Sequence, residues 1–245
     1  MRLVQISDCH LLADKQLALY DVNPYDSLER VLSRIAQNQP EALIATGDIS
    51  GDESAESYGH FIELVTRYLP VCDWRVIPGN HDSNAHFLPS FSGHLLQAGT
   101  SWKLGEWRIH GLDTRFEEAR GTVRSDELAA ITNDIVAHDS ASHLLALHHN
   151  PVQTNSWMDR HLLENASALE NWLSQYPQIA GIIHGHIHSE AETTLAGLPV
   201  KSVPSTCWQW DLTPDFAVDS TAPGFREINL LPEGKWTSTV RRVVQ

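Results

Sequence analysis

Short apolar segments typical of buried strands alternate with amphipathic helical segments along most of this chain. Arg2–Ser7 and Ala42–Thr46 have the composition of two such strands. Between them, Asn23 and Pro24 supply a capping residue and a helix-starting proline, and apolar residues follow at helical spacing. Strands and helices in alternation form mixed sheets that are covered by helices. The sequence therefore predicts an α/β fold.

The alternation continues through two thirds of the chain. Further strands are expected at Trp74–Pro78, Trp102–Leu104, Trp107–Leu112, Leu144–Leu147 and Ile179–Ile183. Further helices are expected from about Ser54, over Asp126–Ala137 and from Ser167, which has the spacing of a capping box with Glu170. After Ser189 the pattern changes to short strands with Gly and Pro turns. We expect a single domain, residues 1–245, with a β-rich C-terminal third.

The charge balance limits the partners of this chain. Asp and Glu number 31 against 17 Lys and Arg, so the net charge is −14. A field of this sign repels nucleic acid and anionic membranes, whereas a small anionic substrate can bind where metal ions supply positive charge. The chain has three cysteines without a CxxC pair, no secretory signal pattern and no long apolar run. These features favour a cytoplasmic protein, and they indicate no oligomeric state.

Polar residues follow five of the expected strands at the point where each strand ends. In chain order they are Asp8 with His10, Asp48, Asn80 with His81 and Asp82, His148 with His149, and His186 with His188. Ligand sites of α/β sheets form at the carboxyl ends of strands, so these five loops can converge on one place. Alone, Gly47-Asp48 is usually a turn and His148-His149 can be a pair of packed histidines, whereas Gly79–Asp82 is a rarer motif that favours a site by itself. All five in this order favour a shared site.

The chemistry of these side chains indicates metal binding. Carboxylate, amide oxygen and imidazole are ligands that suit manganese, iron or zinc. Alternate residues of an extended segment project to the same side, so Asp8 and His10 can serve one small region together. Glycines at positions 47, 79 and 185 permit the tight turns and close backbone approach that such a site needs.

The motifs Asp-x-His, Gly-Asp, Gly-Asn-His-Asp, His-His and Gly-His-x-His in this order resemble the calcineurin-like metallophosphoesterase family. The resemblance extends from Leu3 to the final strand. A narrower resemblance, to the bacterial class III 3′,5′-cyclic-AMP phosphodiesterases, rests on Gly47–Asp52, Ser156–Asp159, Pro204–Cys207 and Ala222–Phe225. The family resemblance implies a four-layer αββα sandwich of two mixed sheets flanked by helices.

The family resemblance also implies a role for each motif residue. The first metal ion is expected to bind Asp8, His10, Asp48 and His188, and the second Asp48, Asn80, His148 and His186. Asp48 then bridges the two ions. His81 is expected to be catalytic beside the phosphate without binding metal, and Asp82 is expected to orient its ring. The substrate phosphate is expected to contact His10, Asn80, His81 and His188.

The implied activity is hydrolysis of 3′,5′-cyclic AMP to 5′-AMP by a binuclear-metal phosphodiesterase. Two divalent ions (iron, manganese or zinc) clamp the phosphate, and a metal-bridging hydroxide attacks phosphorus in line. The same centre would serve a phosphodiesterase of broader specificity, acting on other small phosphodiesters or 2′,3′-cyclic nucleotides. A nuclease for long DNA fits the acidic charge poorly. A scaffold without catalysis does not fit a complete ligand set.

Other histidines have weaker patterns. His149 and His184 are either hydrogen-bond partners of the ligands or packed histidines. Asn150 stands where many family members have a proline after the two histidines, which puts the rigidity of this loop in doubt. The histidines without a ligand pattern are His60, His86, His94, His110, His138, His143 and His161.

The cysteines and tryptophans near the motifs leave two interpretations open. Cys9 lies between two expected ligands, so its side chain is expected to point away from them into the core. Cys207, Trp208 and Trp210 either border a nucleotide pocket, where an aromatic ring could stack on the base, or pack elsewhere. The sequence does not decide between these alternatives.

Overall fold

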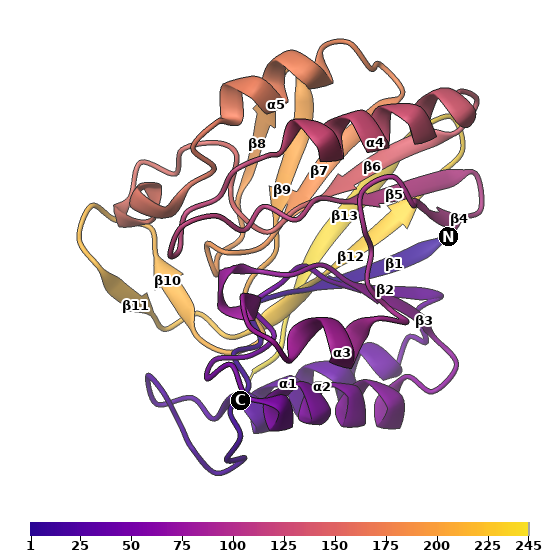
Figure 1. The fold of residues 1–245 in the computed structure, drawn as a ribbon. Helices are drawn as coiled ribbons and strands as arrows, with labels where there is room; N and C mark the ends of the chain where they lie inside the picture. The colour runs from indigo at the N-terminus through magenta and orange to yellow at the C-terminus, as the bar shows by residue number, and fades with distance from the viewer. Residues whose placement is uncertain (245) are drawn as a thin grey trace.

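Two β-sheets packed face to face form the centre of the molecule, and helices cover their outer faces (Figure 1). The computed structural model describes residues 1–244. In spatial order, the first sheet contains β13 (Trp236–Arg242), β12 (Gly224–Leu230), β1 (Arg2–Ile6), β2 (Ala42–Ala45) and β3 (Asp73–Val76). The second contains β4 (Trp102–Leu104), β5 (Trp107–Gly111), β6 (Ser142–Ala146), β7 (Ile179–His184), β9 (Leu198–Ser202) and β8 (Glu192–Leu195).

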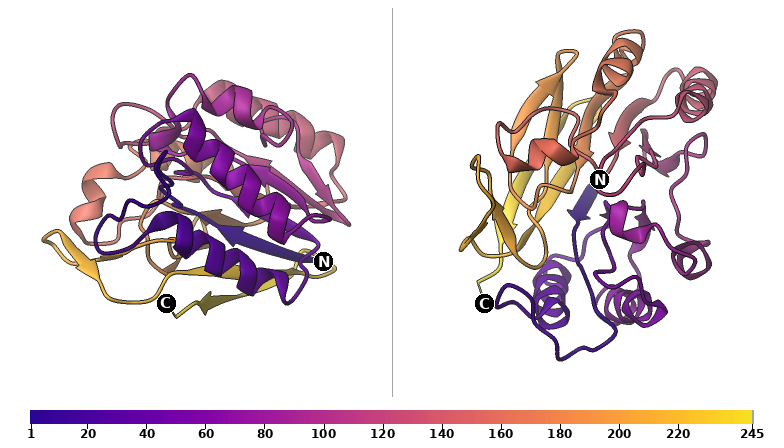
Figure 2. Two further views of the ribbon diagram at one scale, coloured as in Figure 1. Left: turned by 90° about the horizontal axis from the view of Figure 1, so that it is seen from below. Right: turned by 60° about the vertical axis from the view of Figure 1, so that its left-hand side comes forward.

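The helices divide between the two outer faces, as the two views of Figure 2 show. Those on the first sheet are α1 (Pro24–Ala36), α2 (Ala55–Tyr68) and α3 (Phe87–Phe91), and those on the second are α4 (Ser125–Ala137) and α5 (Ala166–Leu173). The connecting loops contain the 3-10 helices η1 (Asn80–Asp82) and η2 (Trp157–His161) and a hairpin of β10 (Gln209–Asp211) and β11 (Ala217–Asp219). Within residues 1–244, no helix is both long and apolar enough to cross a membrane.

Three separate apolar clusters fill the spaces between these layers. One contains Ile6 and Leu28, and so joins the first sheet to its helices. A second contains Ile44 and Ile183, which come from the two different sheets. The third joins the second sheet to α4 and α5. Three apolar interfaces require four layers, so the expected αββα sandwich is confirmed.

The parallel strands of both sheets end at matching levels. Ile6 of β1 lies opposite Ala45 of β2, which lies opposite Val76 of β3. In the second sheet, Ala146 of β6 lies opposite Ile183 of β7. Loops that leave parallel strands at the same level emerge at one edge of a sheet. The register therefore places the polar motifs at neighbouring positions.

The sequence predicts three helix starts at particular residues, and the structure confirms two of them. Asn23 accepts a hydrogen bond from a first-turn amide of α1 (3.0 Å), and Ser54 does the same for α2 (3.1 Å). The capping box expected at Ser167 is wrong, because α5 already begins after Asn165. The Asn165 side chain instead exchanges two hydrogen bonds of 2.8 Å with the main chain of Val123.

Candidate metal centre

The loops that follow β1, β2, β6 and β7 bring six of the seven expected ligands into two groups. The donor atoms of each group lie within 4.8 Å of one another, and the groups are Asp8, His10 and His188, and Asp48, His148 and His186. All six side chains are buried. These two groups coincide with the division into two metal positions that the sequence motifs imply. A third group within the same distance limit, His10, Asp48 and His81, lies beside them and overlaps both.

Asp48 lies between the two groups. Its Oδ2 is 3.8 Å from Nε2 of His10 and 3.3 Å from Nε2 of His148. Within the first group, Oδ1 of Asp8 is 3.5 Å from Nε2 of His188. Since Asp48 adjoins donors of both groups, its carboxylate is placed to contact a cation on either side.

The backbone is strained where it presents these ligands. Five of them have positive φ angles, namely Asp8 (55°), His10 (44°), Asp48 (51°), His186 (71°) and His188 (46°). Residues other than glycine rarely adopt this left-handed region, and they persist there only when the surrounding structure holds them. Such strain clusters at functional sites, so its concentration here supports a binding role for these side chains.

Each of three ligand imidazoles directs its second ring nitrogen to a main-chain carbonyl. Nδ1 of His148 lies 2.7 Å from the oxygen of Thr46, and Nδ1 of His188 lies 2.9 Å from that of Trp208. Nε2 of His186 lies 3.1 Å from the oxygen of His161. A carbonyl accepts a proton on that nitrogen, and the opposite nitrogen then keeps a free lone pair for a metal ion.

Burial sets the protonation of the group. It lowers the pKa of His10 to about 3 and, with the charge of nearby histidines, holds the pKa values of His186 and His188 well below their usual range. Burial, reinforced by the charge of Asp48, raises the pKa of Asp8 to about 7. Against the desolvation caused by burial, the charge and hydrogen bond of Asp48 raise the pKa of His148 to about 9. Three imidazoles that stay neutral beside two buried carboxylates are suited to a cation, and a cation bound there would displace the proton of His148.

The seventh expected ligand, Asn80, also fits a metal ion. Its Oδ1 is buried and has no hydrogen-bond partner among residues 1–244. Buried polar atoms in native structures are nearly always paired, so an unpartnered amide oxygen at this position is suited to bind a metal ion. With the carboxylates and imidazoles beside it, the donor set suits Mn, Fe or Zn and does not distinguish among them.

Two glycines allow the loops after β2 and β3 to meet. A Cβ atom on Gly79 would lie 2.5 Å from the main-chain nitrogen of Asp48 and would also collide with Oδ1 of that residue. A Cβ atom on Gly47 would lie 2.5 Å from Nδ1 of His148. The close backbone approach expected at these positions is therefore present.

His81 and Asp82 point in different directions. His81 is exposed, and its ring centroid lies 5.0 Å from that of His10, edge to face. Asp82 is fully buried and accepts hydrogen bonds from the main-chain nitrogen of Gly79 (2.9 Å) and the hydroxyl of Tyr58 (3.0 Å). Within residues 1–244, the Asp82 carboxylate has no hydrogen bond to the His81 ring. The expected orienting contact is therefore not observed. The carboxylate instead binds the main chain of its own loop at Gly79.

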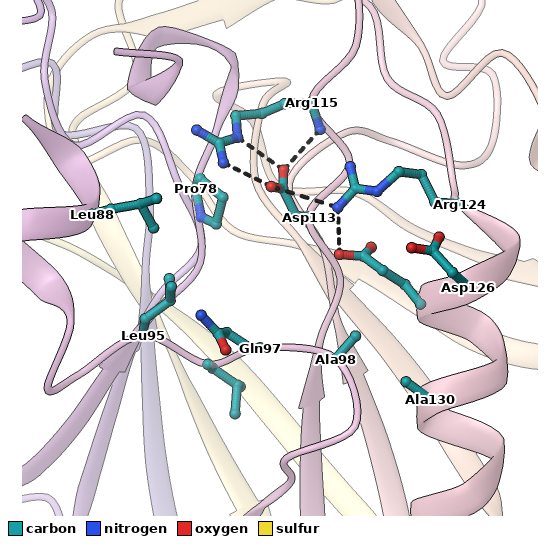
Figure 3. Close-up of a pocket in the computed structure, with 12 residues that line it drawn as sticks. Pro78, Leu88, Leu95, Gln97, Ala98, Asp113, Arg115, Arg124, Asp126 and Ala130 are labelled. Atoms are coloured by element: carbon teal, nitrogen blue, oxygen red, sulfur yellow. Dashed lines mark hydrogen bonds and ion pairs between the residues drawn. The ribbon is translucent and has the colours of Figure 1, made fainter. Parts of the chain in front are cut away.

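A pocket next to this loop contains an arginine that the sequence motifs missed. Figure 3 shows Arg115 paired with Asp113 across from the apolar side chains of Leu88 and Leu95, in a pocket of about 390 Å³. Two nitrogens of Arg115 donate to the Asp113 carboxylate at 2.9 and 2.7 Å, and the third donates to the main-chain oxygen of Asp82 at 2.8 Å. Asp113 and Arg115 follow β5 as the motif residues follow their own strands, so the same sequence signal could have found them.

The weaker sequence patterns are now resolved at several positions. His149 is packed beside the ligands, with Nδ1 2.7 Å from the hydroxyl of Thr114, and His184 is packed with Nδ1 2.9 Å from the oxygen of Gly185. Asn150 ties its own loop by donating to the oxygen of Val152 (3.0 Å).

The cysteines and tryptophans near the end of β1 also have defined positions. Cys9 lies in the apolar core, as expected. Cys207 is buried, with its sulfur 3.2 Å from the main-chain oxygen of Asp8. Trp208 and Trp210 pack against two of the expected ligands, with their rings stacked on those of His10 and His188.

A four-layer sandwich that gathers Asp, Asn and His donors into two groups at its strand ends belongs to the class of metal-dependent hydrolases. The family model described as "Calcineurin-like phosphoesterase" matches residues 1–190. The chain belongs to the calcineurin-like phosphoesterase family, and the expected enzyme class, a metal-dependent phosphodiesterase, is confirmed.

Two similar proteins carry the name 3′,5′-cyclic adenosine monophosphate phosphodiesterase CpdA. The one from Escherichia coli (strain K12) is 35% identical, over 99% of this chain and 90% of its own length. The one from Pseudomonas aeruginosa is 34% identical, over 98% of this chain and 89% of its own length. Among solved structures, a dimetal phosphatase from Danio rerio has a TM-score of 0.68 at 14% identity and covers 100% of this chain and 96% of its own. That last similarity supports the fold alone.

Proposed function

We propose that this chain hydrolyses 3′,5′-cyclic AMP to 5′-AMP at a centre of two divalent metal ions. The observation that carries the proposal is the position of Asp48 between two buried donor groups. Relatives similar over nearly their whole length are named as phosphodiesterases for this substrate. We further propose that one domain carries the whole activity, because β1 and β12 of the first sheet come from opposite ends of the chain.

The seven expected ligands fall into two sets, one for each metal ion, with Asp48 common to both. Asp8, His10 and His188 would hold one ion, Asn80, His148 and His186 would hold the other, and Asp48, which adjoins both groups, would contribute to each. Bound there, two divalent ions supply positive charge for the phosphate and acidify a water molecule that can attack phosphorus. The carbonyls of Thr46, Trp208 and His161 keep the imidazoles oriented toward them.

His81 supplies the proton chemistry. It is exposed beside His10, so its imidazole reaches a phosphate that lies between the donor groups. His10, Asn80 and His188 border the same phosphate. Hydrolysis forms a bond from the water oxygen to phosphorus and breaks the bond from phosphorus to O3′. His81 donates a proton to O3′ as that bond breaks, and the product is 5′-AMP. Asp82 serves this step indirectly, by fixing the loop that carries His81.

Product analysis tests the proposal directly. The protein is supplied with Mn²⁺, Fe²⁺ or Zn²⁺ and incubated with 3′,5′-cyclic AMP, 2′,3′-cyclic AMP and glycerophosphoethanolamine in parallel. The proposal expects 5′-AMP from the first substrate at the highest kcat/KM with at least one metal. Equal turnover of all three substrates would favour the broader phosphodiesterase, and absence of 5′-AMP with every metal would remove the cyclic-AMP assignment.

A variant at His81 separates catalysis from metal binding. His81→Ala removes the imidazole but keeps the main-chain nitrogen that donates to Oδ1 of Asp48 at 2.9 Å. We expect turnover to fall by about 10²- to 10⁴-fold, the range for loss of a general acid, while metal content stays normal. Loss of both metals in this variant, measured by elemental analysis, would contradict the role given to His81.

A further inference from the structure

Five aromatic side chains form a continuous surface, here called the aromatic platform, which consists of Tyr20, Trp157, Trp208, Trp210 and Phe216. The ring of Tyr20 lies 5.1 Å from that of Trp208 and 5.3 Å from that of Trp210. The ring of Phe216 lies 5.4 Å from that of Trp210 and 4.9 Å from that of Trp157. These separations fall in the range of favourable aromatic contacts.

The platform adjoins the metal centre directly. The ring of Trp208 stacks on that of His10 with centroids 5.1 Å apart and an angle of 22° between the planes. The ring of Trp210 stacks on that of His188 at 4.7 Å and 21°. Both histidines belong to the first group of donors. A phosphate held at that group therefore lies beside the platform.

Part of the platform is open to solvent. Tyr20 is 48% exposed and Phe216 is 53% exposed, whereas Trp208 is buried. Exposed apolar side chains continue the surface at Leu19 and Val218, both 42% exposed. An apolar patch exposed at the edge of a polar site is unfavourable in water, and such patches commonly mark a binding surface.

The platform is assembled from segments that are distant in the sequence. Tyr20 precedes α1, Trp157 begins η2, and Trp210 and Phe216 lie on and beside the β10–β11 hairpin, at the left of Figure 1. Trp157 is tied to that hairpin because its main-chain nitrogen donates to the oxygen of Thr213 (2.9 Å) and its indole to the oxygen of Asp211 (3.2 Å). These bonds hold the aromatic rings together without a ligand.

We propose that the aromatic platform stacks the base of a nucleoside phosphodiester whose phosphate lies at the metal centre. This inference rests on the proposed function and names the feature that selects the substrate. Every base has a π-face, so stacking tolerates different bases. The site therefore accepts adenine and guanine cyclic nucleotides alike, and it discriminates against phosphodiesters that lack a ring.

Steady-state kinetics of Phe216→Ala and Trp210→Ala test the platform. The substrates are 3′,5′-cyclic AMP, 3′,5′-cyclic GMP and glycerophosphoethanolamine, which has no ring. We expect KM for both cyclic nucleotides to rise by about 5- to 100-fold, the range for losing one stacked base, with a smaller change in kcat. Metal content is measured for both variants, and Trp210→Phe should recover most of the affinity.

Tyr176→Ala is the matched control. Tyr176 also packs on a tryptophan, Trp172, but it precedes β7 and so lies at the strand end opposite the metal centre. Its removal should leave the preference for cyclic nucleotides unchanged. An equal rise in KM for the ring-free substrate, or a change of oligomeric state in Phe216→Ala that accounts for the effect, would overturn the platform proposal.

Product binding separates this proposal from the proposed function. 5′-AMP and inorganic phosphate are titrated into the metal-loaded wild type and Phe216→Ala, and binding is followed by tryptophan fluorescence. The platform predicts weaker binding of 5′-AMP in the variant and no change for phosphate. If the wild type hydrolyses no cyclic nucleotide but this difference is found, the proposed function fails and the stacking surface stands. Equal affinities for 5′-AMP would overturn the platform.

Discussion

Nη1 of Arg115 donates a hydrogen bond to the main-chain oxygen of Asp82 at 2.8 Å, while the other two donors of the same guanidinium grip the carboxylate of Asp113. Asp82 directly follows His81. A rigid, bidentate ion pair outside the metal centre therefore holds the end of the loop that presents the proposed proton donor. The first sheet contributes that loop and the second sheet contributes Arg115, so the contact also joins the two halves of the sandwich.

Loss of this contact should lower kcat more than it changes KM. In Arg115→Ala the loop keeps its other bonds but loses a charge-assisted hydrogen bond, a kind of bond worth about 1.5–3 kcal/mol. We expect kcat for cyclic AMP to fall about tenfold, with normal metal content. Arg115→Lys should recover little, because an ammonium group lacks the planar fork that serves both partners.

Arg120→Ala is the control for this experiment. Arg120 lies in the same connecting segment as Arg115, and its side chain pairs with Glu117 and Glu164. It is more exposed than Arg115 and contacts carboxylates away from the His81 loop. Unchanged kcat in Arg120→Ala together with a tenfold loss in Arg115→Ala would support a positioning role. A similar loss in both variants would show that the effect is general to the segment.

The sequence predicted the layers, and it predicted that the candidate donor residues follow neighbouring strands, because both depend on local patterns. The apolar strand before Asp48 can be recognised from a few consecutive residues. Parallel pairing of such strands then places the polar residues that follow them close together. The carbonyls of Thr46 and His161 could not be predicted in this way. A main-chain oxygen is the same in every residue, so its contact with a ligand imidazole depends only on the tertiary fold.

Two expectations differ from the structure for a similar reason. Ser167 and Glu170 have capping-box spacing, yet Asn165 lies before the helix because its side chain binds the main chain of Val123, far away in sequence. Asp82 was expected to orient His81 because the two are neighbours, but adjacent residues of a tight turn project in different directions. In each case a long-range contact determined the position of a side chain whose sequence context suggested a local one.

Asp48 should be the ligand whose loss affects both metal ions. Asp48→Asn keeps the size of the side chain but removes the charge shared between the donor groups. We expect metal content to fall from two ions to less than one per chain, with affinity reduced by more than about 100-fold, beyond the effect typical of outer hydrogen-bond partners. His186→Ala should retain one ion in the group of Asp8, His10 and His188. Elemental analysis and titration calorimetry measure both variants, and two retained ions in Asp48→Asn would contradict the shared position.

The close approach of two loops makes Gly79 irreplaceable. In Gly79→Ala the new Cβ would meet the main-chain nitrogen of Asp48 at 2.5 Å, and a backbone atom cannot move aside as a flexible side chain can. We expect the free energy of unfolding to fall by about 1–3 kcal/mol, as in overpacked cores, and metal binding to weaken. Gly59→Ala is the control, because Gly59 lies within α2 and a Cβ there meets no atom within 4 Å. That substitution should raise the free energy of unfolding by about 0.5–1 kcal/mol. Denaturant unfolding compares the two, and equal effects would show that the loop contact is unimportant.

A buried histidine outside the candidate metal centre should make stability depend on pH. His110 is 1% exposed, and burial, with the charge of His143, lowers its pKa from 6.5 to about 4. Between these values the unfolded chain binds a proton that the folded chain excludes, so the free energy of unfolding rises with pH across this range. The stabilisation is present above pH 6.5 and is lost as the pH falls toward 4, by at most about 3 kcal/mol.

Replacing His110 by an uncharged residue should flatten this dependence. In His110→Gln the group that titrates is absent from both states, so the difference in unfolding free energy between pH 6.5 and pH 4.5 should be smaller than in the wild type. His86→Gln, at an exposed position, should leave that difference unchanged. Urea unfolding at several pH values measures the three proteins under the same metal concentration. Because the variant and the wild type share one metal centre, protonation of its ligands contributes equally to both, and a slope as steep in His110→Gln as in the wild type would exclude His110 as its source.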